Sequence, residues 1–222
     1  MLRRLLLGAC LTVAAGLGLF LATLPDVRPL AKRFPPTTAF MERRRESLAR
    51  SGVSTRLDWR PVAISRISPA LQRAVVAAED ARFWEHDGVD WIAVKTAVLH
   101  DWDRGRISHG GSTITQQLAK NLYLSPARTP WRKLREWAIA RRLEKELSKR
   151  RILELYLNVV EFGPRTYGAE AAARRYFGKP AIALAPSEAA TLAAMIPSPR
   201  IYDPMRHPGR VERRARRIRG WM

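Results

Sequence analysis

The chain has 222 residues, and its 40 Lys and Arg against 20 Asp and Glu give a formal net charge of +20. An apolar content of 46% excludes a disordered polyelectrolyte, and a single cysteine excludes an internal disulfide or a cysteine-cluster metal site. The length suits one domain with an appendage. The basic excess predicts an anionic partner, which would be nucleic acid, a membrane surface or a phosphorylated substrate.

The first 24 residues resemble a membrane anchor. Arg3 and Arg4 precede Leu5–Leu24, a run of 20 residues without charge. That length suffices to span a bilayer as a helix, and the two arginines favour a cytoplasmic N-terminus. We therefore expect residues 1–24 to form a cytoplasmic tip and a transmembrane helix, with the remainder on the outer side. A cleavable signal peptide and a lipoprotein signal at Cys10 are less favoured interpretations.

The following segment, residues 25–67, is interrupted by prolines and is interpreted as a linker close to the membrane. Within it we expect a short charged helix over Ala39–Arg50 and some strand character over Asp58–Ser65. From Ser68 onward the pattern is mostly helical. Ser68 is a suitable N-cap, and Pro69 suits the first helical position.

The first stretch with chemical interest is the helix that begins there. Leu71, Val75, Ala78 and Arg82 share one helical face. Glu79 lies at the edge of that face among apolar neighbours. Burial would raise its pKa toward values that suit a general base. The alternative is an ordinary acid on a helix surface beside a turn.

A second stretch combines a glycine-rich loop with a polar helix. Gly110 and Gly111 predict an open loop, and Ser112 is expected to cap the helix that follows. One face of that helix carries Thr113, Gln116, Gln117 and Lys120. Free amides at a helix start bind anions, and Lys120 would neutralise a phosphate there. A solvated polar face is an equally good interpretation. A nucleotide P-loop is excluded, because no Gly-Lys-Ser/Thr ending is present.

A third stretch predicts one long helix. Thr129 is its expected N-cap, Pro130 takes the first turn, and the apolar pattern runs from Trp131 to Leu157. Glu136 falls on the apolar side of this helix. A carboxylate in that position must be paired, hydrogen-bonded or functional, because an isolated buried charge is costly. Pairing with an arginine is the structural alternative to a catalytic role.

Five ordered groups of residues resemble the family fifty-one glycosyltransferases, the peptidoglycan glycosyltransferases that occur alone or in bifunctional penicillin-binding proteins. The resemblance covers residues 68–204. The matching segments are Glu79–Gly88, Gly110–Leu122, Arg132–Glu136 with Ser148–Lys149 and Ile152–Asn158, Tyr167–Ala173 with Tyr176–Lys179, and Glu188–Ala193 followed by Pro197, Pro199, Tyr202 and Pro204. One departure is Glu161, an acid where the family commonly has an aromatic residue.

The resemblance implies a mainly α, lysozyme-like fold with a large lobe and a small membrane-proximal lobe around a cleft. The glycosyltransferase domain would be residues 68–204, and residues 205–222 would be a basic C-terminal tail that serves the anionic membrane rather than the active site. The stretch holding Trp91, Val94, Val98, Leu99 and Trp102 is expected either to dip into the membrane or to pack in the core.

The resemblance also implies an activity: the polymerisation of lipid II into linear β-1,4 glycan strands, with inversion and release of undecaprenyl pyrophosphate. Glu79 would be the base, and Glu136 a second carboxylate that assists pyrophosphate departure or holds a metal. The donor and pyrophosphate site would be lined by Ser112, Gln116, Lys120, Arg128 and Lys133. Supporting positions would be Asp80, His86, Thr113, Gln117 and Asn121, with Asp80 and His86 bracing the loop of the base. Magnesium or manganese is implied by family resemblance alone, because no metal-ligand spacing is present.

The expected partners are lipid II, the growing glycan strand, the anionic inner membrane and, by extension, penicillin-binding and division proteins. The domain would lie on the periplasmic side. No Ser-x-x-Lys or Lys-Thr-Gly motif is present, so transpeptidase activity is not expected. Three other interpretations stay open at this point: a lytic transglycosylase or muramidase, a membrane-tethered nucleic-acid binder, and a non-enzymatic scaffold for cell-wall synthesis. Nucleic acid is not expected as a partner.

Overall fold

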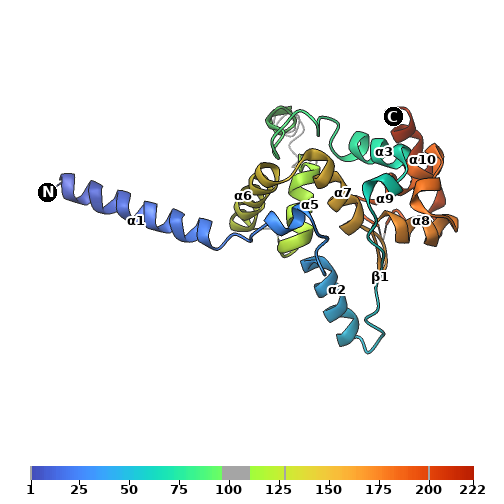
Figure 1. Cartoon of the computed structure of the whole chain (residues 1–222), viewed down its shortest axis with the longest axis horizontal. Helices are drawn as coiled ribbons and strands as arrows, with labels where there is room; N and C mark the ends of the chain where they lie inside the picture. Colours follow the sequence, from blue (N-terminus) through green and yellow to red (C-terminus); the bar gives the residue numbers. More distant parts are fainter. Residues whose placement is uncertain (1, 97–110, 128, 200) are drawn as a thin grey trace.

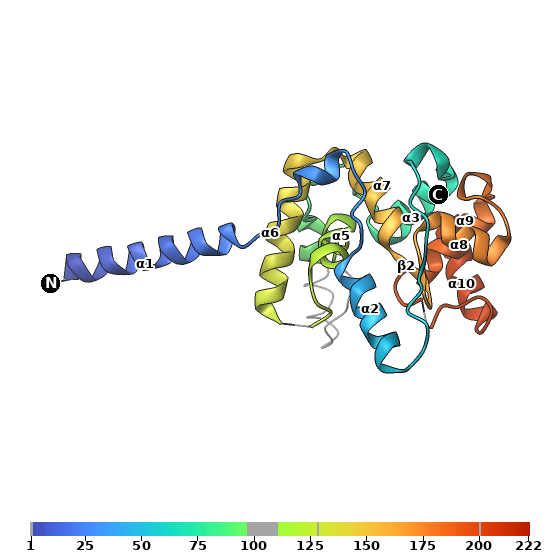
Figure 2. The same cartoon turned by 60° about the horizontal axis from the view of Figure 1, so that its bottom comes forward.

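The computed structural model describes residues 2–96, 111–127, 129–199 and 201–222. The described chain is mainly helical, which confirms the mainly α part of the predicted fold class. Helix α1 (Leu2–Ala22) extends away from a body formed by the remaining elements, in both views of the molecule (Figures 1 and 2). The C-terminus lies at the far end of that body from α1 (Figure 1).

The body is built from helices with a few short strands. The longer helices are α2 (Ala39–Arg50), α3 (Pro69–Glu79), α5 (Ile114–Tyr123), α6 (Pro130–Glu146), α7 (Lys149–Val159), α8 (Ala169–Phe177), α9 (Pro186–Met195) and α10 (Pro208–Arg219). Short 3-10 turns are η1 (Arg28–Ala31), η2 (Ile64–Arg66) and η3 (Ala181–Ala183), and the strands are β1 (Asp58–Trp59), β2 (Glu161–Gly163) and β3 (Thr166–Tyr167).

Two groups of helices make the core. Helix α5 packs against α6 and α7, and α3 packs against α9 and α10. Ile114, Leu118 and Leu122 follow one another at four-residue intervals on α5, and all three are buried, as the apolar pattern predicts. In Figure 2 α5 lies between α6 and α7, with α3, α9 and α10 on the other side of α7. The two groups meet where α3 ends and α5 begins.

Helix α2 begins and ends as predicted, with the Thr38 hydroxyl accepting from the Met41 amide at its start. The segment expected as a linker is tied to α7 by hydrogen bonds. The Trp59 indole donates to the Asn158 carbonyl at 2.7 Å, and the Ile64 amide donates to Glu154 Oε1 at 2.7 Å. These bonds hold the approach to α3 in place.

Within the described residues the strands form one small sheet in the order β1-β3-β2. Strand β1 is parallel to β3 with Asp58 opposite Thr166, and β2 is antiparallel to β3. The strand expected over Asp58–Ser65 is therefore only two residues long. Pro61 has no amide hydrogen for a ladder bond, so the pairing ends before it.

Three local predictions were wrong at helix ends. The long helix expected up to Leu157 is two helices, because Ser148 caps a new start and accepts from the Arg151 amide at 3.3 Å. Helix α3 ends at Glu79, so Arg82 lies beyond it rather than on its apolar face. The cap of α5 is Thr113 rather than Ser112. The caps expected at the starts of α3 and α6 are confirmed.

The chain expected as a basic tail contains helix α10. Val211, Ala215 and Ile218 recur at helical spacing and are buried, while Arg213 and Arg217 are exposed. The buried face packs on α9 and α3 (Figure 1). This segment is thus an amphipathic helix attached to the wall of the cleft described below.

In the parts of the chain that the structure describes, no helix combines the length and the hydropathy that a membrane crossing requires. Residues 91–96 are helical, and the Trp91 side chain at their start is exposed. Val94 of that expected amphipathic stretch is half-buried, and its remaining positions, Val98, Leu99 and Trp102, lie outside the described residues.

Candidate active site

A cleft of about 1480 Å³ opens where α3 ends and α5 begins. Its lining residues include Gln72, Val76, Glu79, Asp80, Trp84, Ser112, Thr113, Gln117, Lys120, Arg214 and Trp221. Helices α3, α5 and α10 and the C-terminal residues thus supply its walls. The cleft unites the first two sequence stretches with residues close to the C-terminal end of the sequence.

Glu79 is the last residue of α3, and its side chain is 9% exposed. Burial raises the pKa of Glu79 above its ordinary value, as predicted from its place at the edge of the apolar face. A hydrogen bond from Gln117 and the charges of Arg214 and Lys120 oppose that rise, and the charge of Asp80 adds to it. The carboxylate is therefore desolvated but held by donors and cations.

Two hydrogen bonds fix the amide that contacts Glu79. Gln117 Nε2 donates to Glu79 Oε2 at 3.0 Å. The Tyr156 hydroxyl donates to Gln117 Oε1 at 2.8 Å from α7. Each end of the amide thus has one partner, and the amide joins α5 to α3 and α7.

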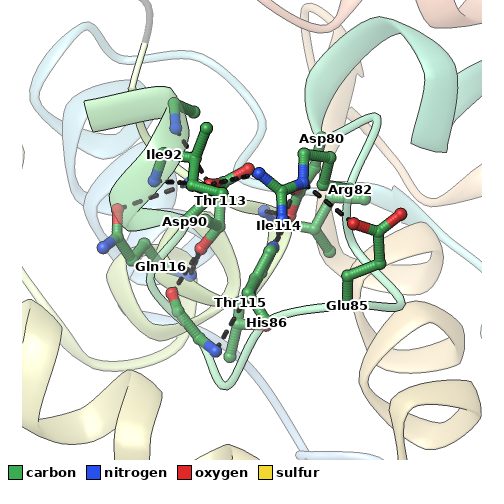
Figure 3. Close-up of polar contacts among 12 residues, drawn as sticks. Asp80, Arg82, Glu85, His86, Asp90, Ile92, Thr113, Ile114, Thr115 and Gln116 are labelled. Carbon is green, nitrogen blue, oxygen red and sulfur yellow. Dashed lines mark hydrogen bonds and ion pairs between the residues drawn. The ribbon is translucent and has the colours of Figure 1, made fainter. Parts of the chain in front are cut away.

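Asp80 joins three segments next to Glu79 (Figure 3). Its carboxylate accepts from His86 Nε2 at 2.9 Å and from the Ile114 amide at the start of α5 at 2.9 Å. The Gly88 amide donates to His86 Nδ1 at 3.1 Å, so the proton of the neutral ring lies on Nε2. Asp80 and His86 therefore brace the loop after Glu79, as predicted.

The start of α5 is fixed by a capping box. Thr113 Oγ1 accepts from the Gln116 amide, and the Gln116 side chain accepts from the Thr113 amide. The Thr113 hydroxyl also donates to the Gly88 carbonyl at 2.6 Å, a contact that links α5 to the braced loop (Figure 3). Gly88 has φ of +90°, a conformation that favours glycine.

Glu136 is buried on α6, with a side chain 3% exposed, and lies between two cations. Arg132 donates to Oε2, and Lys133 Nζ donates to Oε1 at 2.6 Å. Lys133 also reaches Ser112 Oγ at 3.2 Å and Gln116 Oε1 at 3.3 Å. Glu136 is therefore a paired acid, and its partner Lys133 connects α6 to the start of α5.

Lys120 lies one turn along α5 from Gln116 and lines the cleft. Burial lowers the pKa of Lys120, and the charges of Glu136 and Glu79 raise it in part. Its ammonium lies 5.9 Å from the centroid of the Phe40 ring. Lys120 thus lies within electrostatic reach of both carboxylates singled out from the sequence.

The structure places six of the predicted site residues on the cleft: Glu79, Asp80, Ser112, Thr113, Gln117 and Lys120. Gln116 and Asn121 are buried on α5, and Gln116 Nε2 has no partner among the described residues. Arg128 lies outside the described residues. The predicted positions thus gather at the α3–α5 junction, with Lys133 and Glu136 joined to it through Ser112.

A family model described as Transglycosylase matches residues 46–222. The chain belongs to the transglycosylase family. This confirms the resemblance inferred from the ordered motifs, and the matched span of this transglycosylase includes α10 as well as the predicted site. A biosynthetic peptidoglycan transglycosylase of Nitrosospira multiformis is 50% identical over 188 residues, which are 85% of this chain and 82% of that protein. The protein of that name in Laribacter hongkongensis is 52% identical over 173 residues, 78% and 76% of the two chains.

Sequence reasoning missed a charged partner of Glu79 in the transglycosylase cleft. Arg214 Nη2 lies 3.5 Å from Glu79 Oε1, although 135 positions separate the two residues. We expected the arginines of this segment to be separate from the active site, and Arg214 contradicts that expectation. The signal was available in the apolar spacing of Val211, Ala215 and Ile218, which predicts a helix packed on the body. Nothing in that spacing identifies Glu79 as the partner.

The donor groups that the structure describes at this site do not fit a resident metal. Among the described residues, no group of three or more His, Cys, Asp and Glu could hold a metal ion. Glu136, the carboxylate considered for that role, is already engaged by two cations whose charge opposes a divalent ion there. No step of the mechanism proposed below therefore passes through a metal.

Proposed function

We propose that this transglycosylase polymerises lipid II into linear β-1,4 glycan strands of peptidoglycan, releasing undecaprenyl pyrophosphate. The observation that carries the proposal is the desolvated Glu79 carboxylate, held by Gln117 and Arg214 in the same cleft as Lys120. The names of the relatives support it, because they are biosynthetic peptidoglycan transglycosylases at about half identity. Transpeptidation is not part of the proposal.

In this mechanism Glu79 is the general base. The sugar hydroxyl of the acceptor attacks the anomeric carbon of the donor and passes its proton to the Glu79 carboxylate. A carbon–oxygen bond forms on one face of the donor sugar as the bond to pyrophosphate breaks on the other, so configuration inverts. The raised pKa suits this role, since a base works best with a pKa near the operating pH.

The leaving pyrophosphate needs positive charge and hydrogen-bond donors. We assign this role to Lys120, to Lys133 with Ser112, and to Arg128. The Gln116 amide adds a donor to this group. Its Oε1 accepts from Lys133, and its Nε2 has no partner among the described residues. Glu136 holds Lys133 in position by its ion pair rather than acting as an acid, because each of its two carboxylate oxygens is already engaged by a cation.

Peptidoglycan synthesis takes place at the cell envelope. We propose that residues 1–24 anchor the enzyme in the inner membrane and that the catalytic domain lies on the periplasmic side. The charge-free run of Leu5–Leu24 after Arg3 and Arg4 supports this. Carbonate extraction of membranes, with protease added to intact spheroplasts, tests both points. Protein released by carbonate, or protected from external protease, would contradict the anchor or its orientation. Penicillin-binding and division proteins are proposed partners only.

The activity test uses purified full-length protein and fluorescent lipid II in detergent, with products separated by gel electrophoresis. The proposal predicts a ladder of glycan strands that lysozyme digests. Parallel incubation with purified sacculi tests for a muramidase, which would release muropeptides. Release of muropeptides from sacculi without polymerisation of lipid II would overturn the proposal. If neither glycan strands nor muropeptides form, the result would favour a non-enzymatic scaffold.

A further inference from the structure

Tyr156 is a buried polar residue that the mechanism above does not use. It lies on α7 with no exposed surface, and its hydroxyl donates to Gln117 Oε1 at 2.8 Å. Burial raises the pKa of Tyr156 well above its ordinary value, so the hydroxyl keeps its proton and stays a donor. A buried hydroxyl without an acceptor is costly, so this bond constrains the amide of Gln117.

The orientation of that amide matters to Glu79. An amide presents donors at its nitrogen and an acceptor at its oxygen. In the observed orientation Gln117 Nε2 donates to Glu79 Oε2 at 3.0 Å. The reversed amide would place its oxygen against the carboxylate and would leave the Tyr156 hydroxyl without its acceptor. In the reversed orientation the amide oxygen of Gln117 would repel an ionised Glu79, so only the protonated acid would tolerate it.

We propose that Tyr156 is a positioning residue of the reaction, whose hydroxyl fixes the Gln117 amide so that its nitrogen faces Glu79 and favours the ionised, proton-accepting carboxylate. This inference rests on the proposed function, because it concerns the base of that reaction. Tyr156 acts through Gln117 and does not itself contact the substrate.

The charged groups that face Glu79 also affect its ionisation, beside the contact from Gln117. Arg214 from α10 and Lys120 from α5 favour its ionised form, while the neighbouring Asp80 opposes it. In Tyr156→Phe these charges are unchanged and the ring still fills its site. Only the constraint on the amide is lost. The pKa of Glu79 therefore rises, and the acidic limb of the pH–rate profile moves upward by about one pH unit. At the alkaline end, where Glu79 is fully ionised, the rate recovers.

The experiment measures lipid II polymerisation in detergent from acid to alkaline pH for wild type and Tyr156→Phe. The matched control is Tyr176→Phe, on α8 and outside the cleft. It removes a hydroxyl that donates to the Phe162 carbonyl at 3.1 Å. The control is expected to keep the wild-type pH limb. An unchanged limb in Tyr156→Phe, or the same movement in Tyr176→Phe, would overturn the inference.

Gln117→Met provides a second variant that leaves Tyr156 intact. It should move the limb in the same direction, and adding Tyr156→Phe should then move it no further. Additive movements would show that Tyr156 does not act through Gln117. Carbon-13 NMR titration of labelled glutamate, with Glu79 assigned by its loss in Glu79→Gln, reads the same pKa without turnover. If wild type fails to polymerise lipid II, the proposed function fails. If it polymerises and the Glu79 pKa is the same in Tyr156→Phe, only this inference fails.

Discussion

Replacing Arg214 by glutamine tests whether α10 controls the charge of the base. The guanidinium lies 3.5 Å from the Glu79 carboxylate. At an effective dielectric constant of about 20, Coulomb's law gives on the order of 5 kcal/mol for that separation. Arg214 is 23% exposed, and water entering the vacated space would replace much of that stabilisation. We therefore expect the pKa of Glu79 to rise by about one unit, equivalent to about 1.4 kcal/mol.

Because Glu79 must be ionised to accept a proton, Arg214→Gln should lose about tenfold in rate on the acidic limb of the profile. The assay is lipid II polymerisation in detergent over a range of pH. The matched control is Arg217→Gln on the exposed face of the same helix, which removes an equal charge away from the cleft. An acidic limb that stays in place in Arg214→Gln would refute the electrostatic role of α10.

Three further predictions concern stability, measured by urea or thermal unfolding. The folded-state pKa of Glu79 is raised, so the native state binds more protons than the unfolded state, and this contribution to stability is lost as pH rises from the unfolded to the folded pKa. Above the folded pKa, Glu79→Gln should therefore be more stable than wild type. Equal or lower stability of Glu79→Gln at that pH would contradict the linkage argument. Glu136→Gln should cost about 3 kcal/mol, because it leaves two cations without their buried partner; a cost below about 1 kcal/mol would argue against a structural ion pair. Gly88→Ala should cost at least about 1 kcal/mol, because φ is +90° and the new Cβ would lie 3.1 Å from Glu144 Cγ; a neutral effect would show that the loop adapts.

Local signals in the sequence predicted much of the secondary structure. Ser68 and Thr129 are the observed caps of their helices, and α2 has the predicted ends. The split after α6 was missed because the apolar period continues across it, so only the hydroxyl of Ser148 marks the new start. Thr113 rather than Ser112 caps α5, because the partner Gln116 completes a box only with Thr113.

The site was predictable where a residue's own helix determines its environment. Glu79 was expected at the edge of an apolar face and Glu136 on one. The Glu79 side chain is 9% exposed, and the Glu136 side chain is 3% exposed. The contacts that give them their chemistry come from distant segments. Arg214 contacts Glu79 from α10, and Tyr156 contacts Gln117 from α7. No spacing within one helix predicts a contact across 135 or 39 positions. The resemblance of the motifs to the family led to the candidate site residues, but only the packing of the helices shows which groups hold the carboxylate.

The most direct test of the central claim is the turnover of Glu79→Gln on lipid II in detergent, together with its binding of lipid II. The amide keeps the size of the acid and the contact with Gln117 but cannot accept the proton of the attacking hydroxyl. The account predicts that binding survives while polymerisation falls by at least about a hundredfold, within the range that general-base catalysis contributes. Glycan strands formed by Glu79→Gln at close to the wild-type rate would contradict the assignment of Glu79 as the base.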